Sequence, residues 1–317
     1  MQGDGCLERL GEFAAREQGT RALIVTDQGI LDAGHVDKAR ASLEAAGLVA
    51  DIFSEVHENP TTEDVAACVT KAREFGADIL IGLGGGSSMD AAKGCNFILT
   101  NGGEMEDYWG LDKATEPMLP FIAIPTTAGT GSECQRFALI SKVDTHAKMA
   151  CGDHKAAARV ALLDPTLTVT QPTFVTACTG MDAITHAVET AVTNKANEAS
   201  LACSHEAFRL LIGHFKTAIE SPEDLEARTA MQVGAALAGA AIEASMLGAA
   251  HSMANPLTAH FDIVHGQAVG LALPAIVRFN GADPRTAEMY KTFMQHAGLA
   301  EDSTTPLESV EKLADIL

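Results

Sequence analysis

The stretch Gly82-Leu83-Gly84-Gly85-Gly86-Ser87-Ser88-Met89-Asp90-Ala91-Ala92-Lys93 runs out of a predicted strand, turns on glycines and enters a predicted helix. Glycines let the backbone approach a pyrophosphate without a Cβ clash, and the free amides of a helix start donate hydrogen bonds to it. The stretch is neither a Gly-x-Gly-x-x-Gly fingerprint nor a P-loop, because the terminal Gly-Lys-Ser/Thr is missing. The alternative interpretation is a tight strand-to-helix connection that Ser87 or Ser88 caps.

Strands and helices alternate on both sides of this turn. Short aliphatic or β-branched runs predict strands over residues 22–26, 49–53, 79–83, 121–124 and 160–163. Helical patterns occupy residues 35–46, 62–75 and 88–99. This alternation predicts a parallel sheet covered on both faces, with ligands bound at the carboxyl ends of its strands.

Two further features follow predicted strands in this first part. A second glycine-rich turn, Pro125-Thr126-Thr127-Ala128-Gly129-Thr130-Gly131-Ser132-Glu133, follows residues 121–124, and its hydroxyls and amides are suited to contact the same anion. Asp27 follows residues 22–26, where a carboxylate can accept hydrogen bonds from ribose hydroxyls. Spacing alone supports a turn or cap at Asp27 equally well.

The pattern changes near Asp164-Pro165 to long Ala-rich helical stretches over residues 175–193, 196–219, 225–247 and 266–279. Pro165 and Pro172 bracket the junction. We therefore expect an α/β domain over residues 1–165 and an all-helical domain over residues 166–317. The apolar residues 230–250 are rich in Ala and Gly and include Glu243, which favours a buried helix over a membrane span.

Metal-ligand residues occur in this second part. Asp182 and His186 lie four residues apart in Thr179-Gly180-Met181-Asp182-Ala183-Ile184-Thr185-His186, so a helix presents both on one face. His251 precedes an Asn-Pro pair expected to break a helix, and His265 precedes a glycine at an expected helix start. These four side chains form one candidate site for a divalent transition metal. The alternative is that each histidine is a structural or surface residue.

The remaining histidines are weaker candidates, and we expect them in loops or on exposed faces: His35, His57, His146, His154, His205, His214, His260 and His296.

The composition limits the classes of binding partner that we expect and indicates a cellular compartment. With 317 residues, 47% of them hydrophobic, the chain can bury a sizeable core. A formal charge of −20 argues against general affinity for nucleic acid or anionic membranes. The seven cysteines are scattered and form no Cys-x-x-Cys pair, which favours reduced thiols in a cytoplasm and disfavours a thiolate zinc site. The first residues lack the order of a signal peptide.

Several separate motifs together resemble one family, the iron-containing (group III) alcohol dehydrogenases. These motifs are Val25-Thr26-Asp27, Asn59-Pro60-Thr61, Gly84-Gly85-Gly86-Ser87, the turn from Pro125 to Glu133, Leu163-Asp164-Pro165, Thr179-Gly180-Met181-Asp182-Ala183 and the pair His251 and His265. The similarity covers nearly the whole chain.

The resemblance implies an α/β dinucleotide-binding domain, a helical domain and an active site in the cleft between them. The family's metal ligands fall on Asp182, His186, His251 and His265. Its cofactor contacts fall on Gly84, Gly85, Gly86, Ser87, Thr126, Thr127, Ser132 and, by a looser match, Lys148. Asp27 matches the position whose carboxylate would repel a 2′-phosphate, so NAD is expected rather than NADP.

The implied reaction is metal-assisted hydride transfer between a small alcohol or diol and the nicotinamide, reversible from the aldehyde or ketone. Fe²⁺ is the family's usual metal in this branch, and the same ligand set accepts Zn²⁺. The family also suggests a homodimer or a larger homo-oligomer. Two alternatives are a glycerol dehydrogenase-like or related reductase of the same fold, and a truncated, non-catalytic nucleotide-binding remnant.

Two departures from the family pattern motivate the second alternative. Asn255 stands where family members often have a histidine, and an amide does not exchange a proton near neutral pH. Family members also usually begin with a further strand region and continue through further helices, so we expect a chain shortened at its carboxyl terminus.

Overall fold

The computed structural model describes residues 1–145, 147–261 and 263–317, without the side chain at position 259. The chain forms two compact units. The first comprises residues 1–127 and 132–170, and the second comprises residues 128–131 and 171–317. A functional division after residue 165 stays a prediction.

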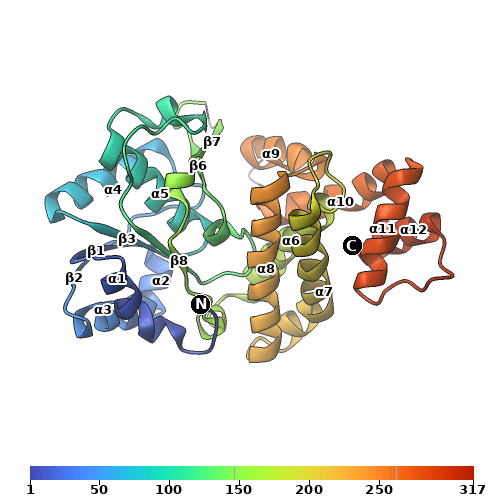
Figure 1. The fold of residues 1–317 in the computed structure, drawn as a ribbon, viewed down its shortest axis with the longest axis horizontal. Coiled ribbons are helices and arrows are strands. Elements are labelled where there is room, and N and C mark those ends of the chain that lie inside the picture. Colours follow the sequence, from blue (N-terminus) through green and yellow to red (C-terminus); the bar gives the residue numbers. More distant parts are fainter. Residues whose placement is uncertain (146, 262) are drawn as a thin grey trace. The chain divides into compact units, whose positions relative to one another are not determined.

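A parallel sheet of five strands forms the centre of the first unit (Figure 1), in the order β2-β1-β3-β5-β8. The strands are β1 (Arg21–Val25), β2 (Val49–Phe53), β3 (Ile79–Gly84), β5 (Phe121–Pro125) and β8 (Val160–Ala161). All five predicted strands and the parallel sheet are therefore confirmed.

Alternate side chains of these strands enter two different hydrophobic cores. Leu23 and Val25 of β1 belong to one core, whereas Ala22 and Ile24 belong to the other. Because successive side chains point to opposite faces of a strand, this division shows that both faces of the sheet are buried. The covering helices of this unit are α1 (Leu10–Arg16), α2 (Gln28–Asp32), α3 (His35–Ala45), α4 (Thr62–Phe75) and α5 (Gly86–Asn101).

A second, three-stranded sheet in this unit was not predicted. It has the order β4-β7-β6, from β4 (Gly110–Leu111), β6 (Phe137–Ser141) and β7 (Lys148–Gly152), with β6 and β7 antiparallel. Short 3-10 helices complete the unit: η1 (Cys6–Arg9), η2 (Met105–Tyr108), η3 (Ser132–Cys134), η4 (His154–Ala156) and η5 (Pro165–Thr168).

The described residues of the second unit form helices and no strand. These helices are α6 (Thr173–Thr190), α7 (Glu198–Glu220), α8 (Leu225–Ser245), α9 (Ala249–Phe261), α10 (His265–Gly281), α11 (Pro284–His296) and α12 (Pro306–Ile316). A single hydrophobic core joins residues of α6, α7, α8 and α10 to α11 and α12. The predicted fold class, an α/β part followed by a helical part, is confirmed.

The expected helix break at Asn255-Pro256 is wrong, because α9 continues through Pro256. The apolar stretch around α8 is a mostly buried helix, as expected: Gln232, Ala235, Ala236 and Ala238 are all buried.

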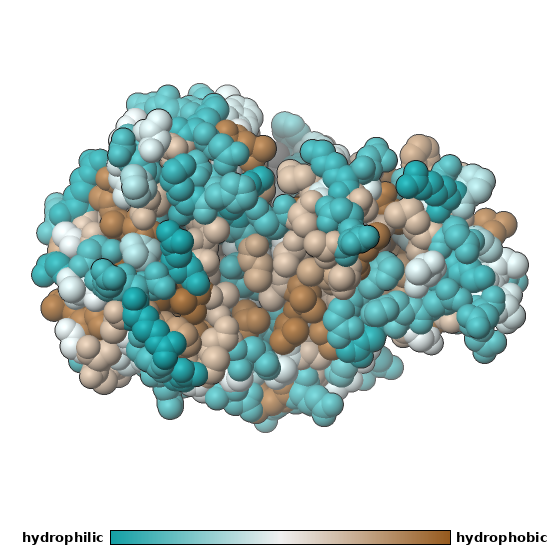
Figure 2. All heavy atoms as spheres, in the orientation of Figure 1, coloured by the Kyte–Doolittle hydropathy of each residue, from teal (hydrophilic) through white to brown (hydrophobic). Residues whose placement is uncertain are grey.

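Figure 2 shows mainly hydrophilic side chains on the visible face of each unit, with smaller hydrophobic patches between them. No single helix in the described ranges is long and apolar enough to cross a membrane. The pair Leu225–Ser245 and Ala249–Thr258, bent by 105°, passes that test only when its two helices are taken together.

Candidate metal centre and cofactor-binding residues

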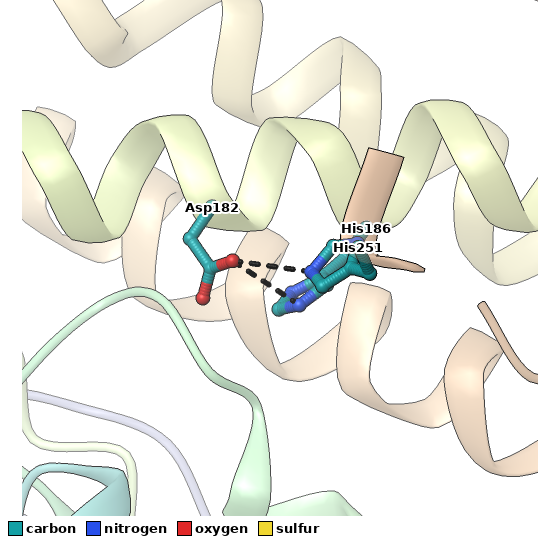
Figure 3. A group of neighbouring side chains, drawn as sticks. All are labelled: Asp182, His186 and His251. Atoms are coloured by element: carbon teal, nitrogen blue, oxygen red, sulfur yellow. Dashed lines mark hydrogen bonds and ion pairs between the residues drawn. The ribbon is translucent and has the colours of Figure 1, made fainter. Parts of the chain in front are cut away.

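Helix α6 carries the first two candidate metal ligands. Asp182 and His186 are separated by about one helical turn, so both side chains project from the same face of α6. Both are buried, and His251 reaches them from α9 (Figure 3). His265 is the first residue of α10.

Three imidazole nitrogens converge on one carboxylate oxygen, Asp182 Oδ1. Its distances to the Nε2 atoms are 3.4 Å for His186, 3.3 Å for His251 and 3.8 Å for His265. The rings of His186 and His251 stack with centroids 4.7 Å apart. The structure therefore brings all four predicted ligands together.

The spacing of these atoms fits a metal ion. Four donors at about 2.0–2.2 Å from one ion, in tetrahedral geometry, lie about 3.3–3.6 Å from one another. Donor atoms of Asp182, His186 and His251 all lie within 4.8 Å of one another and belong to buried residues. His265 lies at the edge of the group, with 28% of its side chain exposed. The chemistry of the set, one carboxylate and three imidazoles, suits Fe²⁺ or Zn²⁺.

Burial and neighbouring charges shift the pKa values of these groups. Burial lowers the pKa of His186 to about 4, so its imidazole is neutral at pH 7, as a ligand must be. Burial opposes ionisation of Asp182, but His186 and His251 outweigh it and hold the pKa of Asp182 well below its usual range. Burial also opposes protonation of His251, yet hydrogen bonds to Asp182 and Glu189 raise its pKa to about 9. A cation here would replace that proton with its own positive charge.

Sequence reasoning missed Glu189, a buried carboxylate on α6. Its Oε2 atom lies 2.6 Å from His251 Nδ1. The available signal was its spacing, because Asp182, His186 and Glu189 follow one another at intervals of four and three residues on the same helix face. That signal is weak without knowing which element faces α6.

Two glycines allow α9 and α10 to approach α6 closely. A Cβ at Gly248, just before α9, would lie 2.8 Å from Glu189 Oε1. A Cβ at Gly266 would overlap the carbonyl oxygen of Cys178 on α6. These close approaches place His251, three residues after Gly248, and His265, directly before Gly266, against the same helix.

In the first unit, the glycine turn connects β3 to α5 as predicted. Gly84 ends β3 with φ +151°, a conformation that favours glycine, and a Cβ there would overlap Ser88 Oγ. Gly85 is the N-cap of α5, and no side chain caps this helix. The interpretation that Ser87 or Ser88 caps the helix is therefore wrong. Among the described residues, no side chain caps the backbone N–H groups at this end, which are therefore suited to bind an anion.

Threonines of the second glycine-rich turn lie beside the first. The backbone N–H of Thr126 donates to the carbonyl oxygen of Gly84 at 3.0 Å, and Thr127 lies beside Gly85. Thr126 is buried, and its hydroxyl has no hydrogen-bond partner among the described residues. A buried hydroxyl in this condition is unfavourable unless a ligand or water satisfies it.

Asp27 lies at the carboxyl end of β1, next to the same turn. It is the N-cap of α2, where its Oδ1 accepts from the Ile30 N–H at 3.1 Å. Its Oδ2 lies 3.4 Å from Ser88 Oγ. Asp27 therefore caps a helix, as one interpretation held, while presenting a carboxylate beside the predicted pyrophosphate turn.

Ser132 and Lys148 make contacts within the protein. The Ser132 hydroxyl donates to Asp90 Oδ1 at 2.7 Å and accepts from Lys93 Nζ at 2.7 Å. Lys148 Nζ donates to Asn59 Oδ1 at 3.1 Å. Their roles as cofactor contacts stay predictions.

The residues assigned to the metal and to the cofactor belong to different units. All four predicted metal ligands lie in the second unit, and all of the predicted cofactor contacts lie in the first. Among the other histidines, His35 is buried and not exposed as expected, with Nε2 2.9 Å from Thr170 Oγ1. His146 lies outside the described residues.

Two family models match different parts of the chain. Residues 1–165 match the family model described as "Iron-containing alcohol dehydrogenase". Residues 176–317 match "Fe-containing alcohol dehydrogenase family, C-terminal". The chain belongs to the iron-containing alcohol dehydrogenase family.

Individual members of the iron-containing alcohol dehydrogenase family show the extent of the similarity. Alcohol dehydrogenase 4 of Schizosaccharomyces pombe is 37% identical over 94% of this chain and 71% of its own length. The crystal structure of a 1,3-propanediol oxidoreductase superposes with a TM-score of 0.96 at 32% identity, covering 100% of this chain and 82% of the other. The structure of sulfoacetaldehyde reductase from Bifidobacterium kashiwanohense in complex with NAD⁺ has a TM-score of 0.88 at 28% identity, covering 99% and 81%.

As a member of the iron-containing alcohol dehydrogenase family, this chain is an oxidoreductase that acts on CH–OH donors. Asn255, where the resemblance leads us to expect a histidine, lies four residues after His251 on α9 and is exposed.

Proposed function

We propose that this chain is an NAD-dependent, Fe²⁺-dependent alcohol dehydrogenase that interconverts a small alcohol or diol and its aldehyde or ketone. The observation that carries this proposal is the convergence of three Nε2 atoms within 3.8 Å of Asp182 Oδ1. Asp182, His186, His251 and His265 would hold the metal. Zn²⁺ would fit the same donors.

A divalent cation at this site supplies Lewis acidity, which favours the negatively charged form of a substrate oxygen. The protein contributes a buried, neutral imidazole at His186 and a fixed carboxylate at Asp182. Because residue 255 is asparagine, a proton relay through an imidazole at that position does not operate in this chain.

The cofactor proposal rests on the first unit. Gly84, Gly85, Gly86 and Ser87 would bind the pyrophosphate through the uncapped start of α5, and Thr126 and Thr127 would add hydroxyl contacts. Ser132 and Lys148 complete the proposed set. The Asp27 carboxylate disfavours a 2′-phosphate, so NAD is proposed over NADP.

We further propose a cytoplasmic enzyme, because none of the seven cysteines forms a disulfide. A homodimer or larger homo-oligomer is proposed from the family alone.

A coenzyme and substrate panel tests the proposal. The purified chain is loaded anaerobically with Fe²⁺ and mixed with NAD⁺ or NADP⁺ and ethanol, 1,3-propanediol or glycerol. The proposal predicts reduction of NAD⁺ by a short alcohol or diol, at a higher kcat/KM than with NADP⁺. Cofactor reduction with glycerol but with neither other alcohol would favour a glycerol dehydrogenase. No cofactor reduction by folded, metal-containing protein would contradict the proposal.

A further inference from the structure

Glu189 has a set of contacts that neither the family match nor the ligand motif explains. It is buried on α6, with 3% of its side chain exposed. Its Oε1 accepts from the Ala250 N–H at 2.6 Å, and its Oε2 accepts from the Gly248 N–H at 3.2 Å. Both donors lie at the start of α9, so Glu189 caps a helix that is distant in sequence.

The same Oε2 atom lies 2.6 Å from His251 Nδ1. This contact requires the proton on Nδ1, because a carboxylate can only accept a hydrogen bond. The lone pair of a neutral His251 is then on Nε2, the atom that faces Asp182 Oδ1 at 3.3 Å. The Glu189 carboxylate thus fixes the position of the α9 start and the ring orientation of His251. It also determines which nitrogen of His251 is available to bind a metal.

Charge gives a second, independent reason for a carboxylate at this position. A divalent cation with three neutral imidazoles and Asp182 alone would leave one uncompensated positive charge among buried residues. Glu189 would bring the sum to zero, and buried charges are costly unless they are compensated. Glu189 itself is not part of the group of donor atoms that lie within 4.8 Å of one another in the described residues.

We propose that Glu189 is a positioning residue of the metal centre, which holds His251 as the Nδ1-protonated tautomer so that Nε2 binds the cation. This inference rests on the proposed function and deepens it.

The test measures metal affinity and not only turnover. Zn²⁺ is titrated into the apo-protein against a chromophoric chelator, for the unaltered chain, Glu189→Gln and Glu189→Asp. Glutamine has nearly the shape of glutamate but removes the charge and one acceptor. Glu189→Gln is expected to weaken Zn²⁺ binding by about 10- to 100-fold, and Glu189→Asp, which keeps a carboxylate, by less.

Asp224→Ala is the matched control for loss of a helix cap. Asp224 caps α8 in the same unit by accepting from the Ala227 N–H at 3.0 Å. The control is expected to lower the thermal midpoint while leaving Zn²⁺ affinity unchanged. If Glu189→Gln also lowers the thermal midpoint but binds Zn²⁺ as tightly as the unaltered chain, Glu189 is only a cap and the inference is overturned.

A crystal structure of the Zn²⁺-loaded, unaltered chain covers the case in which Glu189→Gln does not fold. Zn²⁺ bound to His251 Nε2, with Nδ1 still within hydrogen-bond distance of Glu189, supports the inference. Binding through Nδ1, or Glu189 as a direct ligand, overturns it while leaving the proposed function intact. Absence of Zn²⁺ from the four-residue site would overturn both.

Discussion

Asp27 has two roles at the residue scale, and two substitutions separate them. Its Oδ1 caps α2, and its carboxylate charge lies beside the glycine turn. Asp27→Asn keeps the cap and removes the charge, whereas Asp27→Ala removes both. We expect both variants to raise the ratio of kcat/KM for NADP⁺ to that for NAD⁺ by at least about 10-fold, because each removes repulsion of a 2′-phosphate worth about 1.4 kcal/mol. Only Asp27→Ala should also lose stability, by about 1 kcal/mol.

Steady-state kinetics with both coenzymes and urea unfolding of the two variants check this prediction. An unchanged coenzyme ratio in Asp27→Asn would show that the charge does not select the cofactor.

Glu133 predicts a pH dependence of stability. It is buried, its Oε2 has no hydrogen-bond partner among the described residues, and burial raises its pKa from 4.5 to about 7. A carboxyl whose pKa is higher in the folded state contributes its full stability below pH 4.5 and loses it as the pH rises to about 7. Glu133→Gln stays neutral throughout. The free energy of unfolding of Glu133→Gln should therefore rise relative to that of the unaltered chain by about 2–3 kcal/mol between pH 4.5 and 7.

Denaturant unfolding at several pH values measures this difference, and contributions from other groups cancel in it. A difference that is constant across this range would contradict the burial argument.

At the element scale, the packing of α8 against the second glycine-rich turn depends on Gly239. A Cβ at this position would overlap the carbonyl oxygen of Gly131, a backbone atom that cannot rotate away. Gly239→Ala is therefore expected to destabilise the protein by about 1–3 kcal/mol despite the better helix propensity of alanine. Gly213 on α7 is the matched control, since a Cβ there meets no atom within 4 Å. Gly213→Ala should be neutral or stabilising by up to about 1 kcal/mol.

Urea unfolding of both variants checks the contrast between the two glycines. Equal effects of the two substitutions would mean that backbone contact at Gly239 is unimportant.

Helix α9 shows why the helix break predicted from the local sequence was wrong. A proline in a helix interior removes one hydrogen bond and costs about 3 kcal/mol, so Asn255-Pro256 predicts a break. Glu189, far away in sequence, accepts from two N–H groups at the start of α9 and supports the helix through contacts that local reasoning does not include. Tertiary contacts therefore outweigh propensity at this element.

At the scale of the whole molecule, the sequence was sufficient for the parts that depend on local periodicity. The central strands, the glycine turn and α6 follow from aliphatic runs, Gly84 to Gly86 and the spacing of Asp182 and His186. The short strands β4, β6 and β7 could not be found in this way, because their pairing joins segments without a strong alternating pattern.

Prediction of the site from the sequence has the same limit, because it cannot include contacts between distant segments. That Asp182, His186, His251 and His265 come together was predictable, because metal chemistry restricts candidate ligands to a few residue types. Glu189 was not, since a buried carboxylate on a helix has meaning only when its partner, the start of α9, is known to lie against it.

We expect one cation, held by Asp182, His186, His251 and His265, to enable alcohol oxidation. The most direct measurement is an anaerobic titration of the apo-protein with Fe²⁺, in which bound iron and the initial rate of NADH formation are recorded together. His265→Ala is the test variant, and His260→Ala, which alters an exposed histidine of α9, is its control. We expect the rate to rise until one equivalent of iron per chain is bound and then to level off. This behaviour should be unchanged in His260→Ala, whereas His265→Ala should lose both bound iron and NADH formation. NADH formation that does not depend on iron, or no NADH formation by folded protein that contains one equivalent of iron, would show that a cation at these four residues does not enable the reaction.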